Sequence, residues 1–196
     1  MAACLQRLAA QWELDVRTTC VDSRRCAKDD LSQTKVRQSY LDRIAAKEFD
    51  AILLSPPCSS FSRATWANFR GPRPVRSYDT PRGNNQLSPA ERDRAILGSI
   101  FADFSYDVAG LVASGAASFL AMEQPEDLGA LAKGPHKGAR PASMWQWPQL
   151  ADLLKQGLRT VVFYQASFGV PYAKPTRLLL HAARHAGLRL RRPALL

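Results

Sequence analysis

The sequence lacks the features that would tie it to a membrane or to a disulfide-stabilised fold. No stretch approaches the roughly 18 consecutive apolar residues of a membrane-spanning helix. In the N-terminal segment, acidic residues occur too early for a secretory signal. There are only four cysteines, and none has the spacing of a zinc site or a CxxC redox pair. These shortages predict an intracellular protein with reduced thiols, in the nucleus or the cytoplasm, and no membrane partner.

Acidic residues are also scarce. The 196-residue chain has 17 Asp and Glu against 27 Lys and Arg, a formal charge of +10. Between Cys58 and Gly83, five arginines stand against one acid, Asp79, and the C-terminal tail carries a second cluster. The tail cluster is Arg184, Arg189, Arg191 and Arg192. Such an excess favours a polyanionic partner, although a solvated basic loop without a partner has the same composition.

Apolar runs and helical periodicities alternate along the chain. Helices are predicted over 3–12, 34–47, 88–115 and 146–157, strands over 16–21, 49–55, 118–124, 158–167 and 176–182, and loops over 59–87 and 129–141. The longest helix has the clearest start, because Ser88, Pro89 and Glu91 form a capping-box pattern. The alternation predicts an α/β fold, a three-layer Rossmann-like domain with a mostly parallel sheet.

Several reactive side chains follow predicted strands. Asp22, Cys58 and Glu123 each stand at the carboxyl end of one, where open α/β sheets place their active crevice. A cysteine near positive charge is held as the nucleophilic thiolate, and a part-buried carboxyl is a possible proton donor. Each has a plainer interpretation: an inert buried thiol for Cys58, and an ion-paired or capping carboxylate for Glu123.

Three separated blocks resemble the DNA (cytosine-5) methyltransferases. SPPCSSFSRA (55–64) resembles the family's Pro-Cys nucleophile block, FLAMEQP (119–125) its Glu-Asn-Val block, and ASFGVPYAKPTRLLL (166–180) its Gly-Val-Pro-Gln-x-Arg-x-Arg block. The resemblance covers residues 16–182 and implies a single methyltransferase-like catalytic domain over 1–196, without a separate target-recognition domain. It also implies S-adenosylmethionine as the cofactor.

The resemblance implies a specific mechanism. Cys58 would attack carbon 6 of a cytosine swung out of its duplex, and Glu123 would protonate ring nitrogen 3. Carbon 5 would then take the methyl group of S-adenosylmethionine, and Lys174 would help to hold the base.

The resemblance also implies binding residues. For the cofactor, Asp22 would hold the ribose, Asp30 and Leu31 would contact the adenine, and Pro56 and Pro57 would line the methionine side; Asp22 also fits a plain turn or helix cap. The loop from Ser59 onward would close over DNA, which is favoured over RNA. Its nucleic-acid-binding residues would be Ser62, Arg63, Arg70, Arg73 and Arg76, with Trp66, Phe69 and Tyr78 as stacking faces.

The chain departs from the family at its start. Residues 1–14 contain no glycine, so the fold is expected to lack the family's first strand and its Gly-rich cofactor turn. Three explanations stay open: a fragment, a divergent relative completed by a partner chain, or a degenerate copy. The alternative function is therefore a catalytically inactive nucleic-acid-binding remnant of the same fold. No metal site is predicted, because His181 and His185 have no evident third ligand.

Overall fold

The computed structural model describes residues 2–13, 15–67 and 69–183. The chain forms two compact units, Met1–Ser39 and Tyr40–Leu196, and each is considered by itself. The arginines predicted as a basic tail cluster, Arg184, Arg189, Arg191 and Arg192, lie outside the described residues, as does His185.

The first unit is built from helices and turns. It contains α1 (Ala2–Gln11), the short 3-10 helix η1 (Ala27–Asp29) and the start of α2 (Thr34–Ala45). The strand predicted over 16–21 is wrong, since these residues are in no sheet. A run of β-branched residues favours a strand only where a neighbouring strand pairs with it. Asp22 instead sits in a turn, where its Oδ1 accepts a hydrogen bond from the Arg24 backbone N–H at 2.9 Å.

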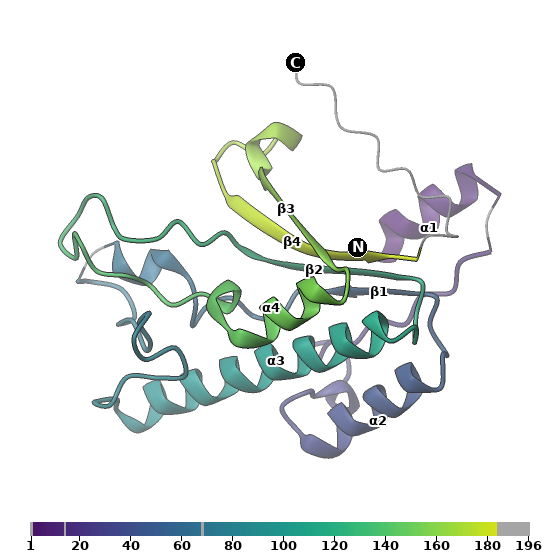
Figure 1. Ribbon diagram of the computed structural model, residues 1–196, viewed down its shortest axis with the longest axis horizontal. Coiled ribbons are helices and arrows are strands. Elements are labelled where there is room, and N and C mark those ends of the chain that lie inside the picture. Colours follow the sequence, from purple (N-terminus) through teal and green to yellow (C-terminus); the bar gives the residue numbers. More distant parts are fainter. Residues whose placement is uncertain (1, 14, 68, 184–196) are drawn as a thin grey trace. The chain divides into compact units, whose positions relative to one another are not determined.

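The second unit holds a four-stranded sheet in the order β1-β2-β4-β3 (Figure 1). The strands are β1 (Ala51–Leu54), β2 (Phe119–Pro125), β3 (Arg159–Tyr164) and β4 (Pro175–Ala182). β1 and β2 are parallel, whereas β4 runs antiparallel to both of its neighbours, β2 and β3. The α/β class is confirmed, but the sheet is mixed rather than mostly parallel. The cause is the short link from β3 to β4, residues 165–174, because a parallel crossover needs about a dozen residues or more.

One long helix packs against this sheet. α3 (Pro89–Ala113) contacts β2 and the shorter α4 (Pro148–Lys155). It begins at the predicted capping box, with the Ser88 side chain and Glu91 bonding each other's backbone N–H groups. By length and composition alone, α3 would also be long and apolar enough to cross a membrane. More than half of that stretch is buried inside the protein, as in an ordinary core helix, so this is weak evidence for a membrane.

Side chains alternate between the two faces of β2. Leu120, Met122 and Gln124 are at most 1% exposed, whereas Glu123 points to the other face and is only half-buried. The buried face of β2 continues into β4 through Leu179, which lies opposite Met122. Two neighbouring residues of β2 therefore lie in different surroundings: Gln124 is in the core, and Glu123 is on the face that solvent partly reaches.

Candidate functional site

The candidate site is centred on Glu123, near the carboxyl end of β2. Lys174 Nζ donates a hydrogen bond to Glu123 Oε1 at 3.2 Å, and Ser55 Oγ donates one to Glu123 Oε2 at 3.1 Å. The side chains of Glu123 and Lys174 are 26% and 39% exposed. A half-buried carboxylate is thus held by one donor after β1 and one before β4, and it stays accessible from solvent.

The antiparallel direction of β4 is what brings Lys174 to Glu123. Glu123 lies opposite Leu178, so the start of β4 meets the end of β2. In an all-parallel sheet, the residue before a strand would lie at the opposite edge from the residues that follow the other strands. The mixed sheet, which differs from the predicted mostly parallel one, therefore places Lys174 beside Glu123.

The turn that carries Cys58 is tied to the same end of the sheet. Gln124 Nε2 donates a hydrogen bond to the Pro56 carbonyl oxygen at 2.5 Å. Two residues later the Cys58 carbonyl accepts the Phe61 backbone N–H at 2.9 Å, which closes a tight turn, and the Cys58 side chain is half-buried. Pro56 is half-buried and Pro57 exposed. The Pro-Pro-Cys segment, Glu123 and Lys174 thus lie at the same end of the sheet.

Two buried residues that follow Cys58 anchor its turn to α3. Ser60 and Phe61 are each 6% exposed. α3 has Gly98 at the contact, where a Cβ atom would lie 2.1 Å from Ser60 Oγ. Phe61 in turn packs edge-on against Trp147, with ring centroids 6.0 Å apart. The absence of a side chain at Gly98 is therefore a condition for the close approach of the Cys58 turn to the helix.

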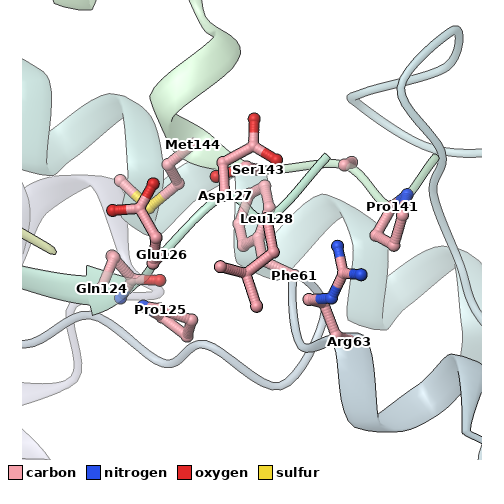
Figure 2. Close-up of a pocket in the computed structure, with 11 residues that line it drawn as sticks. Phe61, Arg63, Gln124, Pro125, Glu126, Asp127, Leu128, Pro141, Ser143 and Met144 are labelled. Carbon is pink, nitrogen blue, oxygen red and sulfur yellow. The ribbon is translucent and has the colours of Figure 1, made fainter. Parts of the chain in front are cut away.

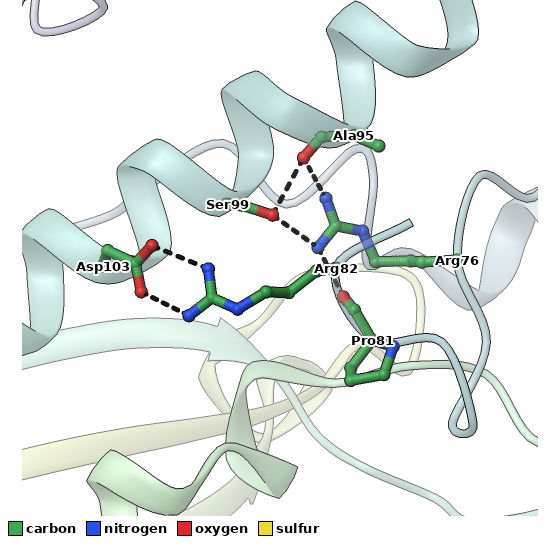
Figure 3. Close-up of polar contacts among 6 residues, drawn as sticks. All are labelled: Arg76, Pro81, Arg82, Ala95, Ser99 and Asp103. Carbon is green, nitrogen blue, oxygen red and sulfur yellow. Dashed lines mark hydrogen bonds and ion pairs between the residues drawn. The ribbon is translucent and has the colours of Figure 1, made fainter. Parts of the chain in front are cut away.

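Arg76 is a structural residue rather than a surface cation, which corrects its assignment to the nucleic-acid-binding set. It is 1% exposed, and its guanidinium lies 4.1 Å above the Phe61 ring. Figure 3 shows its hydrogen bonds to the carbonyls of Pro81 at 2.8 Å and Ala95 at 2.5 Å, with Ser99 Oγ at 3.4 Å. A phosphate cannot reach a guanidinium enclosed in this way.

Burial lowers the pKa of Arg76 to about 10, and the nearby charge of Arg82 adds to the effect. Arg82 is differently placed, since it pairs with both oxygens of Asp103 at 2.8 and 2.9 Å (Figure 3). Its guanidinium also lies 4.3 Å from the centre of the Trp147 ring. The two arginines thus hold the loop over 59–87 against α3, Arg76 through carbonyl groups and Arg82 through a carboxylate.

The other predicted nucleic-acid-binding residues divide into anchored and exposed ones. Ser62 accepts the Ala64 backbone N–H at 3.2 Å and caps the 3-10 helix η2 (Arg63–Trp66). Arg63 Nη1 donates to the Gly129 carbonyl at 2.6 Å. Arg70 and Arg73 are exposed, as a phosphate contact requires.

The residues predicted to hold a cofactor are spread over both units. Asp22, Asp30 and Leu31 belong to the first unit, and Pro56 and Pro57 to the second. The Asp30 carboxylate accepts hydrogen bonds from Ser32 N–H at 2.9 Å and Gln33 Nε2 at 3.3 Å. The bonds from Ser32, followed by that from Gln33, lower the pKa of Asp30 below its usual value. Asp22 and Asp30 therefore both serve local turns.

A small pocket lies at the carboxyl end of β2 (Figure 2). Its volume is about 10 Å³, room for about one water molecule. Gln124 lines it, and its Oε1 is a buried acceptor without a partner among the described residues. Glu126 also lines it and accepts hydrogen bonds from Arg177 Nε at 2.8 Å and Nη2 at 2.6 Å. The pocket contains none of Cys58, Glu123 and Lys174 and is too small for a base.

Sequence reasoning missed two residues that organise the site. Ser55 holds Glu123, and Gln124 holds the Pro56 carbonyl. Both are next to predicted site residues, but a serine before two prolines and a glutamine after a glutamate have many ordinary roles. Only the pairing of β1 with β2 in register shows that these neighbours meet.

Comparisons with known proteins found no similar protein. No family model matches the chain, and neither the curated proteins nor the solved structures include a match. A functional conclusion therefore depends on the geometry of the site.

Proposed function

We propose that the second unit is the base-binding part of a DNA (cytosine-5) methyltransferase-like protein. The observation that carries the proposal is the carboxylate of Glu123, held by Lys174 at 3.2 Å and Ser55 at 3.1 Å. It lies at the sheet edge to which Gln124 ties the Pro56–Cys58 turn. A nucleophile, a carboxyl group and a cation at one half-open edge are the groups that addition to a cytosine ring requires.

The proposed chemistry is a reversible addition. The Cys58 thiolate forms a bond to carbon 6, and the electron pair displaced through carbons 5 and 4 arrives at nitrogen 3. Glu123 takes up a proton from water and passes it to nitrogen 3, and Lys174 holds the carboxyl group and the base in place. The adduct makes carbon 5 nucleophilic, and carbon 5 takes a proton from water while nitrogen 3 gives up its proton. Loss of the hydrogen that carbon 5 first carried then restores the double bond between carbons 5 and 6 and expels the thiolate.

S-adenosylmethionine is the cofactor that the resemblance implies, and when bound it would supply the methyl group for carbon 5. The described residues of the first unit do not fit it: no strand precedes Asp22, and the carboxylates of Asp22 and Asp30 already accept local hydrogen bonds. No step of the proposed chemistry is derived through the cofactor.

This misfit favours one alternative, a catalytically inactive nucleic-acid-binding protein of the same fold. In that case Glu123 and Lys174 would be an ordinary ion pair, and Cys58 an unused thiol. The two functions differ in whether the ring of cytosine is attacked.

Hydrogen exchange at carbon 5 tests the proposal without a methyl donor. The protein is incubated with single-stranded DNA that carries tritium at carbon 5 of cytosine, and tritium released to water is counted. We expect release by the native chain, a loss of at least about a hundredfold in Cys58→Ala and a loss of similar order in Glu123→Gln. Cys26→Ala, which removes an exposed thiol of the first unit, is the matched control and should exchange like the native chain.

Tritium release that survives in Cys58→Ala would overturn the proposed nucleophile. No release from DNA that the native chain binds would favour the inactive nucleic-acid-binding alternative.

A further inference from the structure

Two loops of the second unit lie side by side although residues 88–128 separate them in sequence. The first loop is residues 59–87 and the second loop residues 129–141. Arg63 bonds the Gly129 carbonyl at one end, and at the other Ser77 pairs with Pro141 in an antiparallel bridge. The Tyr78 backbone N–H also donates to a second-loop carbonyl, that of Arg140, at 2.9 Å. Contacts at both ends make the two loops one surface.

An aromatic cluster joins the loops at their middle. His136 of the second loop packs edge-on against Trp66 and Phe69 of the first, with centroid separations of 5.5 and 4.7 Å. Phe69 is nevertheless 76% exposed. At the far end, the Arg140 guanidinium lies 3.4 Å above the exposed ring of Tyr78. The surface therefore presents aromatic rings that pack against a neighbouring side chain and are also exposed to solvent.

The charge of the surface comes from both loops. The second loop carries Lys133, Lys137 and Arg140 and has no acid in its sequence. Lys133 and Lys137 are exposed, and neither forms an ion pair with a carboxylate within the described part of the chain. The first loop adds the exposed Arg70 and Arg73. Sequence reasoning assigned nucleic-acid contacts to the first loop alone.

We propose that the two loops together bind single-stranded DNA, with the second-loop lysines on its phosphates and Phe69 beneath a base. Cations placed beside exposed aromatic rings are the usual means of holding a single strand. A duplex offers phosphates to the lysines but keeps its base faces stacked and out of reach of Phe69, so the single strand is the better partner. The inference shares its partner with the proposed function, but it needs neither Cys58 nor Glu123.

The test uses a single strand made only of thymidine, about 20 nucleotides long and labelled with a fluorophore. Because it has no cytosine, binding is measured independently of any ring chemistry. Anisotropy titrations over a series of salt concentrations give the affinity and its salt dependence. The variants are Lys133→Ala with Lys137→Ala, and Phe69→Ala. The control is Lys155→Ala with Arg159→Ala, which removes two exposed charges elsewhere in the second unit.

We expect the lysine pair variant to lose affinity and to lower the slope of log K against log salt by about 1.4, for two phosphate contacts. Phe69→Ala should bind about tenfold more weakly, and the control should match the native chain. Equal binding by the lysine pair variant and the control would overturn the proposal. Tighter binding of the matching duplex than of the single strand would also overturn the proposal.

Discussion

At the residue scale, Arg76 shows that charge and position are separate properties. Its sequence context, among arginines and prolines, is typical of a surface loop. Its side chain is instead enclosed by Phe61 and by the carbonyls of Pro81 and Ala95. Carbonyl oxygens balance this cation, since no ion pair joins it to a carboxylate among the described residues. A buried cation without an acid depends on every one of these acceptors.

Arg76→Ala should therefore destabilise the fold by about 3 kcal/mol, because it removes charged hydrogen bonds and leaves buried carbonyls unpaired. Arg73→Ala, three residues away and exposed, should stay within about 0.5 kcal/mol of the native chain. Urea unfolding of the two variants measures the difference. Equal stabilities would contradict the structural role of Arg76.

At the element scale, α3 is the support for the Cys58 turn. Two of its glycines make a matched pair. At Gly98 an added Cβ would lie 2.1 Å from Ser60 Oγ and 2.9 Å from an Arg76 guanidinium nitrogen, whereas at Gly110 it would meet nothing within 4 Å. The same substitution thus tests the contact at one site and the intrinsic helix propensity at the other.

Gly98→Ala should destabilise the protein by about 1–3 kcal/mol through overpacking. Gly110→Ala should stabilise it by up to about 1 kcal/mol, because alanine is the better helix former. Chemical denaturation gives both values. A stabilising Gly98→Ala would mean that Ser60 does not pack closely against α3.

The start of α3 gives a pH-dependent prediction. Hydrogen bonds from the Ser88 backbone N–H and hydroxyl lower the pKa of Glu91 below its usual value. A lowered folded-state pKa stabilises the protein above the unfolded-state pKa, and this stability is lost as the pH falls through the folded-state pKa. Glu91→Gln should therefore be less stable than the native chain near pH 7 and approach it near about pH 3. Thermal melts across this range measure the gap, and a gap that is unchanged in acid would contradict the charged cap.

The same elements show which features sequence patterns can predict. The capping box at Ser88 and the apolar runs of β1, β2 and β4 are local signals, and those elements appear where they were predicted. The strand over 16–21 is absent, because β propensity needs a neighbouring strand. Long-range contacts have no such local signal. The Lys174–Glu123 contact follows from the direction of β4, which is set by the short link before it, and the Ser55–Glu123 contact follows from the register of β1 with β2.

At the scale of the whole molecule, the two units differ in what they offer. The second unit gathers Cys58, Glu123 and Lys174 at one end of the sheet, whereas the described residues of the first unit form no strand. The net charge of +10 suits a DNA partner for the chain as a whole. The proposed chemistry on the base therefore does not depend on a methyl-donor site in the first unit.

The structure of the first unit predicts that S-adenosylmethionine does not stabilise the isolated chain. A ligand that binds the folded state raises the melting temperature with its concentration, by mass action. We expect no shift at about 1 mM S-adenosylmethionine. A shift that grows with concentration and disappears in Asp30→Ala would contradict our reading of the first unit.

The most direct test of the central claim is the detection of a bond between Cys58 and a cytosine ring. The chain is incubated with single-stranded DNA containing 5-azacytosine, in which nitrogen replaces carbon 5 and makes carbon 6 more electrophilic. Digestion and mass spectrometry then locate any added base. The account predicts an adduct on the Cys58 peptide that is absent from Cys58→Ala and weak in Glu123→Gln. Bound DNA with an unmodified Cys58 peptide, or an adduct on Cys20 or Cys26 instead, would contradict it.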